Sequence, residues 1–147
     1  MTTPAQHDTR VPAAATGRLA TLRGNCMGAA VLLIVQFGLG MGLNLYVTLP
    51  SGKSFFATVF SSAVLAVHAV VALALLGAAI SALVRAIRAR RAVAFTSAGL
   101  AAILVAAGAG VSFAGHQGNG ASLTMALATA AAMFCYLAAI FSLQVRA

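Results

Sequence analysis

Acidic residues are nearly missing from this sequence, because Asp8 is the only one among 147 residues. Charged residues of both signs make up 7% of the chain, against about 25% in soluble globular proteins. Hydrophobic residues make up 62%, against about 45–50% in such proteins. This composition excludes a water-soluble globule. It also excludes disorder over most of the chain, since disorder requires low hydrophobicity and high charge.

Several kinds of chemistry lack the residues that they require. The two cysteines, Cys26 and Cys135, form no CxxC pair, so we expect free thiols and no thiol–disulfide exchange. The sequence offers no four-ligand cluster for zinc. General acid–base catalysis requires several cooperating groups, and no carboxylate accompanies His68 in its apolar run. We therefore expect a non-enzymatic protein without catalytic residues, metal or resident cofactor.

Four long apolar runs occupy most of the chain, at residues 26–47, 57–84, 92–114 and 121–143. As helices, these runs are about 30–40 Å long, which matches the hydrocarbon thickness of a bilayer. None of them alternates polar and apolar residues as a transmembrane strand does. The sequence therefore predicts an all-α integral membrane protein, in which residues 26–144 form an antiparallel four-helix transmembrane bundle.

The basic residues predict the orientation of this bundle. Eight of the nine lie in residues 1–25, in residues 85–91 or at Arg146, and Lys53 lies alone in the connection on the other side. Cytoplasmic connections are enriched in Lys and Arg, so we expect both termini in the cytoplasm. We interpret residues 1–25 as a flexible basic cytoplasmic tail. The first apolar run is too long for a cleaved secretion signal, so we expect it to remain as an anchor.

The arginine cluster in residues 85–91 has a second expected use. Cations next to a bilayer attract anionic lipid head groups, each by about 1 kcal/mol. We therefore expect lipid head-group contacts from Arg85, Arg88, Arg90 and Arg91. Nucleic acid is not an expected partner, because no basic stretch carries interleaved aromatic residues.

The apolar runs contain no Asp, Glu, Lys or Arg, which argues against an antiporter driven by an intramembrane carboxylate.

Gln36 and His68 lie near the centres of the first two runs, so we predict a hydrogen bond between them. Ser61 and His68 are seven residues apart and are expected on one face of the second helix. We predict a polar seam along the bundle interior. Its members are Gln36, Asn44, Ser61, His68, Thr129 and Tyr136.

Two interpretations of His68 remain open at this point. It is either a neutral imidazole that fixes the register of two helices, or a functional group that serves as a haem ligand, a proton relay or a contact for a small ligand. Haem ligation by two histidines does not fit, because His116 lies in the connection at 115–120, about 15–20 Å from His68. A haem b held by His68 alone remains an alternative.

The spacing of glycines indicates close helix packing. Gly24 and Gly28, and also Gly38 and Gly42, are four residues apart, and such small-residue pairs allow helices in lipid to approach closely. The third run carries a similar stripe of small residues, made of Gly99, Ala102, Ala106 and Gly110.

Three parts of the chain resemble a group of small four-span bacterial integral membrane proteins of unassigned activity. These parts are Gly42–Pro50, His68 in its apolar run, and Ser122–Ala126. The resemblance covers the four runs, and it implies a multi-pass protein of the bacterial cytoplasmic membrane.

The leading functional hypothesis is an accessory membrane protein that packs against partner membrane proteins or against a second copy. The alternative is a protein that binds or transports haem, quinone or a small neutral solute in the polar seam around His68. A channel or transporter formed by an oligomer is less favoured, because an uncharged four-helix bundle leaves little room for a hydrated path.

Overall fold

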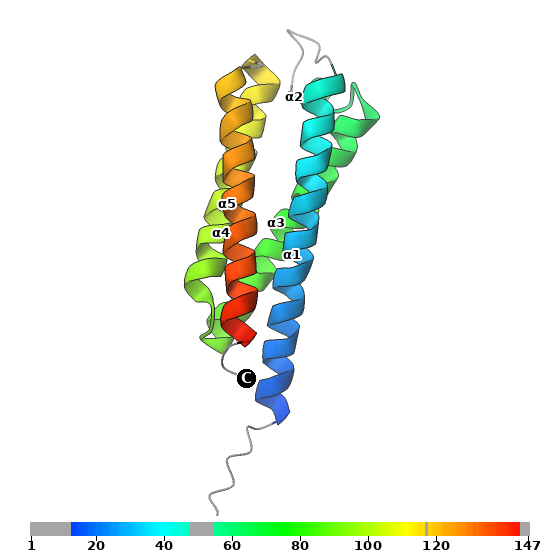
Figure 1. The fold of residues 1–147 in the computed structure, drawn as a ribbon. Coiled ribbons are helices and arrows are strands. Elements are labelled where there is room, and N and C mark those ends of the chain that lie inside the picture. The colour runs from blue at the N-terminus through cyan, green and yellow to red at the C-terminus, as the bar shows by residue number, and fades with distance from the viewer. Residues whose placement is uncertain (1–12, 48–54, 117, 145–147) are drawn as a thin grey trace, which may run out of the picture.

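A computed structural model describes residues 13–47, 55–116 and 118–144 of the protein. These residues form five helices and no strand, and four of the helices are long and apolar (Figure 1). The predicted all-α fold is therefore confirmed. The helices are α1 (Ala13–Tyr46), α2 (Phe55–Val59), α3 (Ala63–Ala89), α4 (Val93–His116) and α5 (Asn119–Gln144).

The four long helices run side by side in an antiparallel bundle (Figure 1). Helix α1 packs against α3 and α5, and α4 packs against the same two helices. Each long helix thus contacts the next one along the chain, and the last closes on the first. The short helix α2 packs against α3 and α4.

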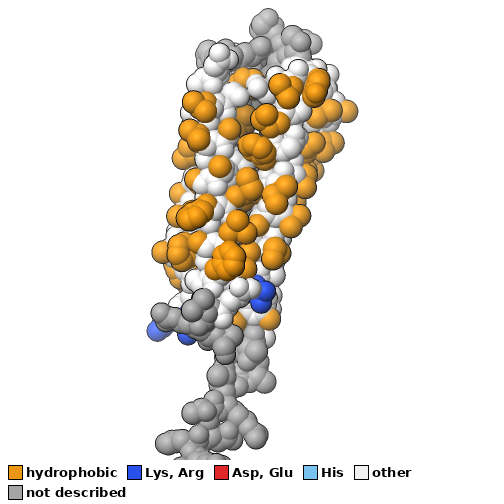
Figure 2. All heavy atoms as spheres, viewed as in Figure 1, with side chains coloured by type: hydrophobic (Ala, Val, Ile, Leu, Met, Phe, Trp, Pro, Cys, Tyr) orange, Lys and Arg blue, Asp and Glu red, His pale blue; other side chains and the backbone are white. Residues whose placement is uncertain are grey.

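Each long helix contains a segment that is long and apolar enough to cross a membrane. These segments are Gly17–Tyr46, Ala63–Ala89, Val93–Gly115 and Asn119–Gln144. In Figure 2 hydrophobic side chains cover the visible face of the bundle, and the described basic side chains gather at one end. Since many large apolar side chains are exposed on this surface, lipid is the solvent that it fits. The fold is that of a small four-span membrane protein.

The first helix begins earlier than the sequence analysis predicted. Helix α1 starts at Ala13, so residues 13–25 are helical and the interpretation of residues 1–25 as one tail is wrong for this part. Residues 1–12 lie outside the described residues. The apolar run marks where lipid begins, whereas a helix continues as long as its residues favour it, as the alanines and leucines before Cys26 do.

The second predicted span is divided. Helix α2 ends at Val59, and α3 begins at Ala63 after Ser62, whose extended backbone (φ −140°, ψ 133°) forms the N-cap position. Ser62 makes no side-chain capping hydrogen bond, whereas the hydroxyl of Ser61 donates to the carbonyl oxygen of Thr58, and such local bonds of serine compete with a helix. At its other end α3 continues beyond the expected residue 84 to Ala89.

The turn between α3 and α4 is tight. Arg90 adopts a left-handed conformation (φ 52°), and its N–H donates to the carbonyl oxygen of Ile87. The N–H of Arg91 donates to the carbonyl oxygen of Ala86. These bonds occupy carbonyl groups that the end of a helix leaves free, and they allow α4 to begin at Val93.

The continuous cluster of buried apolar residues lies between the middle of the bundle and the end where α1 begins. In α3 its members are four, three and four residues apart, at Leu75, Ala79, Ala82 and Ala86. This is the spacing of left-handed helix pairs that cross at about 20°. The other helices contribute Leu22, Cys26, Ala29, Ala30, Leu33, Ile103, Ala132, Tyr136, Ala139 and Ile140.

Candidate functional site

Gln36 of α1 and His68 of α3 form a hydrogen bond between the two helices. The Nε2 atoms of the two side chains are 2.9 Å apart, which confirms the predicted bond. Gly40, one turn after Gln36, lets the imidazole approach the α1 backbone, because a Cβ at this position would lie 3.4 Å from the ring carbon Cε1 of His68. The glycine and the glutamine therefore position the histidine together.

Each side chain of the Gln36–His68 pair has a further atom that could form a hydrogen bond. Since the amide Nε2 of Gln36 donates, the Nε2 of His68 accepts, and the imidazole proton belongs on Nδ1. This Nδ1 and the Oε1 of Gln36 are both buried, and neither has a hydrogen-bond partner among the described residues. One free donor and one free acceptor thus lie together between α1 and α3.

His68 does not lie at the centre of its helix. Because α3 begins at Ala63, His68 is about 8 Å from the start of the helix at 1.5 Å per residue. Its predicted position near the centre was wrong because the apolar run also includes α2 and the break that follows it. The Gln36–His68 pair therefore lies on the side of the bundle away from the arginines.

The remaining members of the predicted seam do not join this pair. Asn44 is exposed, and its Oδ1 accepts a hydrogen bond of 3.4 Å from the hydroxyl of Ser122. Ser61 precedes α3, so its expected position on one helical face with His68 is wrong, and its hydroxyl donates to the carbonyl oxygen of Thr58. Thr129 is buried, but its hydroxyl donates to Met125 in its own helix at 2.7 Å. A continuous seam is therefore absent from the described residues.

Among the described residues, Tyr136 of α5 is the largest fully buried side chain. Its ring lies against Gly99 of α4, where an added Cβ would be 2.8 Å from the ring carbon Cε2. Its hydroxyl is buried and has no hydrogen-bond partner among the described residues. Tyr136 thus fills the core beside Gly99, in the half of the bundle opposite to His68.

The two ring nitrogens of His68 are not available to bind a haem iron. The lone pair on Nε2 already accepts the hydrogen bond from Gln36, and Nδ1 then carries the proton. An iron would require one of these nitrogens to be free and unprotonated. The side chain of His116 lies outside the described residues. Within the described part of the chain, no group of three or more His, Cys, Asp or Glu residues is placed to hold a metal ion.

The arginines expected to contact lipid divide into two sets. Arg85 and Arg88 line a pocket between α3 and α1, together with Arg18, which the sequence analysis missed because it assigned residue 18 to a tail. Arg90 and Arg91 lie in the turn after α3. The signal that would have found Arg18 is the helix-favouring composition of residues 13–25, which extends α1 alongside α3.

The glycines of α1 divide in a similar way. Gly40 faces His68, whereas an added Cβ would meet nothing within 4 Å at Gly24, Gly28, Gly38 or Gly42. The two small-residue pairs noted in the sequence are therefore not used inside the bundle. In contrast, Gly99 faces Tyr136 and Gly110 faces the sulfur of Met125 at 3.5 Å, so the α4 stripe contacts α5 at both of its ends.

No protein-family model, no curated protein and no solved structure matches this chain.

Proposed function

We propose that this protein is a non-enzymatic integral membrane protein that acts by packing the outer face of α1 against a helix of a partner membrane protein or of a second copy. One observation carries the proposal. A stripe of small and β-branched residues runs along α1, spaced alternately four and three residues apart, and five of its six members are exposed while Gly42 is partly exposed. The α1 stripe comprises Gly24, Gly28, Val31, Val35, Gly38 and Gly42.

The opposite face of α1 supports this use of the stripe. Leu22, Cys26, Ala29 and Leu33 have the same alternation of spacings, and all four are buried in the contacts that α1 makes with its own bundle. Lipid tails supply no hydrophobic driving force between helices, so close backbone approach and van der Waals contact must stabilise association. Glycines in a heptad spacing provide that approach, and valines provide stiff side chains that lose little entropy.

The proposed location is a bacterial cytoplasmic membrane, with the arginine-rich end of the bundle on the cytoplasmic side. All described basic residues lie near the start of α1 or around the turn after α3. These two segments are at the same end of the bundle, as Figure 1 allows the reader to follow. The positive-inside rule supports this orientation.

The α1 stripe is tested by bulky substitution. We expect Gly28→Leu and Gly38→Leu to weaken association with the partner or second copy about tenfold or more, because a leucine side chain separates the two backbones and loses more than about 1.4 kcal/mol of packing. The measurement is cross-linking in native membranes, followed by light scattering of the protein extracted in mild detergent.

Gly77→Leu in α3 and Gly108→Leu in α4 are matched controls. Both glycines are exposed and face open space, but neither belongs to the α1 stripe. Equal losses in all four variants would contradict the proposal. A protein that stays monomeric and solitary in native membranes and in every mild detergent would contradict it as well.

A second candidate function is the binding of a small polar ligand at the Gln36–His68 pair. The free donor on Nδ1 and the free acceptor on Oε1 favour it, because a buried polar atom without a partner costs about 1–3 kcal/mol. A quinone carbonyl would accept from Nδ1, and a neutral solute with both a donor and an acceptor would satisfy both atoms.

This second function predicts that mass spectrometry of gently extracted protein detects a stoichiometric quinone or solute. His68→Ala is expected to remove the ligand, because it removes the free donor and releases the amide of Gln36. Asn44→Ala is the control, since Asn44 bonds elsewhere. Ligand-free protein, or equal ligand content in both variants, would eliminate this candidate and leave the pair as a purely interhelical bond.

A further inference from the structure

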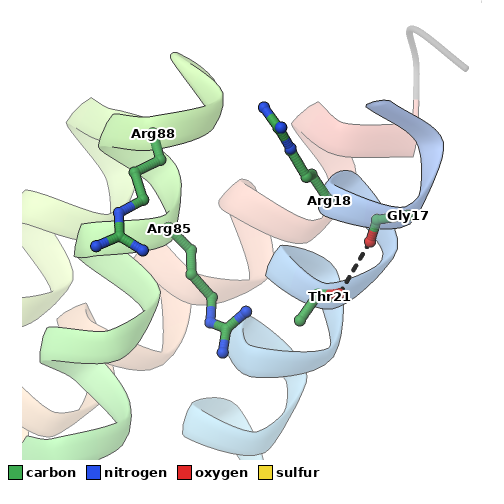
Figure 3. A pocket seen from close by; sticks show the side chains of 5 residues that line it. All are labelled: Gly17, Arg18, Thr21, Arg85 and Arg88. Atoms are coloured by element: carbon green, nitrogen blue, oxygen red, sulfur yellow. Dashed lines mark hydrogen bonds between the residues drawn. The ribbon is translucent and has the colours of Figure 1, made fainter. Parts of the chain in front are cut away.

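A pocket of about 800 Å³ lies between the start of α1 and the end of α3. Gly17, Arg18 and Thr21 line it from α1, and Arg85 and Arg88 line it from α3 (Figure 3). The three arginine side chains are exposed, so a ligand reaches them from outside the bundle. The antiparallel packing of the two helices places these three arginines, which come from segments far apart in the sequence, around one pocket.

The pocket holds three positive charges and no negative one. Asp8, the only acid in the sequence, lies outside the described residues, so no carboxylate in the described part of the chain neutralises Arg18, Arg85 or Arg88. Guanidinium groups that share one pocket repel each other, and a bound anion reverses this repulsion. Arginine also presents a planar set of donors that matches the oxygens of a phosphate group.

Hydrogen bonds hold the pocket side of α3 in place. The Nε of Arg85 is 3.5 Å from the Oγ of Ser81, which also accepts a hydrogen bond of 3.0 Å from the amide of Asn25 in α1. The Asn25–Ser81 bond therefore joins α1 and α3 beside the pocket, and the contact of Arg85 with Ser81 uses only its Nε, which leaves its terminal nitrogens for a ligand. Across the pocket, the hydroxyl of Thr21 donates to the carbonyl oxygen of Gly17 at 2.9 Å (Figure 3).

Space for a ligand comes from Gly17. A Cβ added there would meet nothing within 4 Å, so the α1 side of the pocket is open next to the three cations. Arg23, Arg90 and Arg91 are exposed at the same end of the bundle but are not among the residues that line this pocket.

The level of the pocket along the bundle indicates the source of the anion. The uncharged part of α3 before Arg85, residues 63–84, rises about 33 Å, close to the thickness of a hydrocarbon core. Arg85 and Arg88 therefore lie where phospholipid phosphates lie. We infer that this pocket binds the phosphate group of an anionic phospholipid, with Arg18, Arg85 and Arg88 as its ligands.

The test uses the full-length protein in nanodiscs of phosphatidylcholine with a minor share of phosphatidylglycerol. Native mass spectrometry measures how strongly phosphatidylglycerol is enriched on the protein. We expect Arg18→Gln, Arg85→Gln and Arg88→Gln each to lower the affinity about tenfold, because each removes one charge-assisted contact. Arg23→Gln in α1 and Arg91→Gln after α3 are the matched controls and are expected to retain the wild-type enrichment.

Two further measurements keep the result interpretable. Arg85→Lys preserves the charge and is expected to recover part of the enrichment, and circular dichroism shows whether each variant keeps its helices. Inorganic phosphate titrated into protein in pure phosphatidylcholine nanodiscs, followed by phosphorus NMR, tests the free anion as the source.

Enrichment that falls in the pocket variants and not in the controls supports the inference. Equal loss in pocket and control variants overturns it, since a diffuse surface charge would then explain the binding. If inorganic phosphate binds in a way that depends on Arg85 but phosphatidylglycerol is not enriched, the inference that the anion comes from a lipid is overturned. These outcomes are independent of the α1 stripe, so the two proposals fail separately.

Discussion

Replacing Tyr136 with alanine is expected to destabilise the bundle by about 3–5 kcal/mol, the largest single effect that the structure predicts. The ring is fully buried, and it contacts α4 at Gly99 while belonging to the cluster that α1 and α3 also form. Removing it leaves a cavity in this cluster, and seven of the thirteen other members are alanines, which have no further side-chain atoms to move into the space.

Removing only the hydroxyl group of Tyr136 is not expected to destabilise the bundle. It is buried without a hydrogen-bond partner among the described residues, so Tyr136→Phe removes an uncompensated polar group and is expected to leave stability unchanged or to raise it by about 1 kcal/mol. Unfolding in SDS-titrated micelles measures both variants, and Phe134→Ala, a truncation at an exposed aromatic of the same helix, is the control. A clear loss of stability in Tyr136→Phe would mean that the hydroxyl binds a group outside the described residues.

Gly99→Ala is the second substitution with a large expected effect. Its Cβ would lie 2.8 Å from one ring carbon of Tyr136 and 3.1 Å from another, so either the ring or helix α4 must move. Overpacking of this kind costs about 1–3 kcal/mol. The loss arises although alanine favours a helix more than glycine does.

Gly108→Ala is the matched control on the same helix. An added Cβ at Gly108 meets nothing within 4 Å, so we expect a gain of about 0.5–1 kcal/mol from helix propensity alone. In the double variant Gly99→Ala with Tyr136→Leu, most of the Gly99 penalty is expected to disappear, because the two sites are in contact. Additive losses in this cycle, or equal behaviour of Gly99→Ala and Gly108→Ala, would contradict the contact.

The pattern of apolar residues correctly predicted the number and approximate position of the long helices. The four runs correspond to α1, α3, α4 and α5, because a segment in lipid must satisfy its backbone hydrogen bonds internally. The ends of the helices were predicted less well. The early start of α1 at Ala13 depends on helix propensity outside the apolar run, and the break before Ala63 depends on local competition by serine.

The candidate sites show the same division. The Gln36–His68 bond was predictable, since two polar side chains on neighbouring helices in lipid have few other partners. The role of Gly40 beside the imidazole was not, and neither was the pocket that joins Arg18 to Arg85. Both depend on how far α1 is rotated and extended against α3.

Composition and the spacing of apolar residues alone determined that this chain is a bundle of four membrane-crossing helices. They did so because the solvation of side chains and the hydrogen bonding of the backbone are local requirements that every helix meets independently. Only the tertiary structure decided which glycines pack inside and which face outward, and which arginines share a pocket. The rotation of a helix about its axis is set by the contacts with all its neighbours together. Two opposite faces of α1 have the same spacing of residues, so the spacing does not indicate which face points into the bundle.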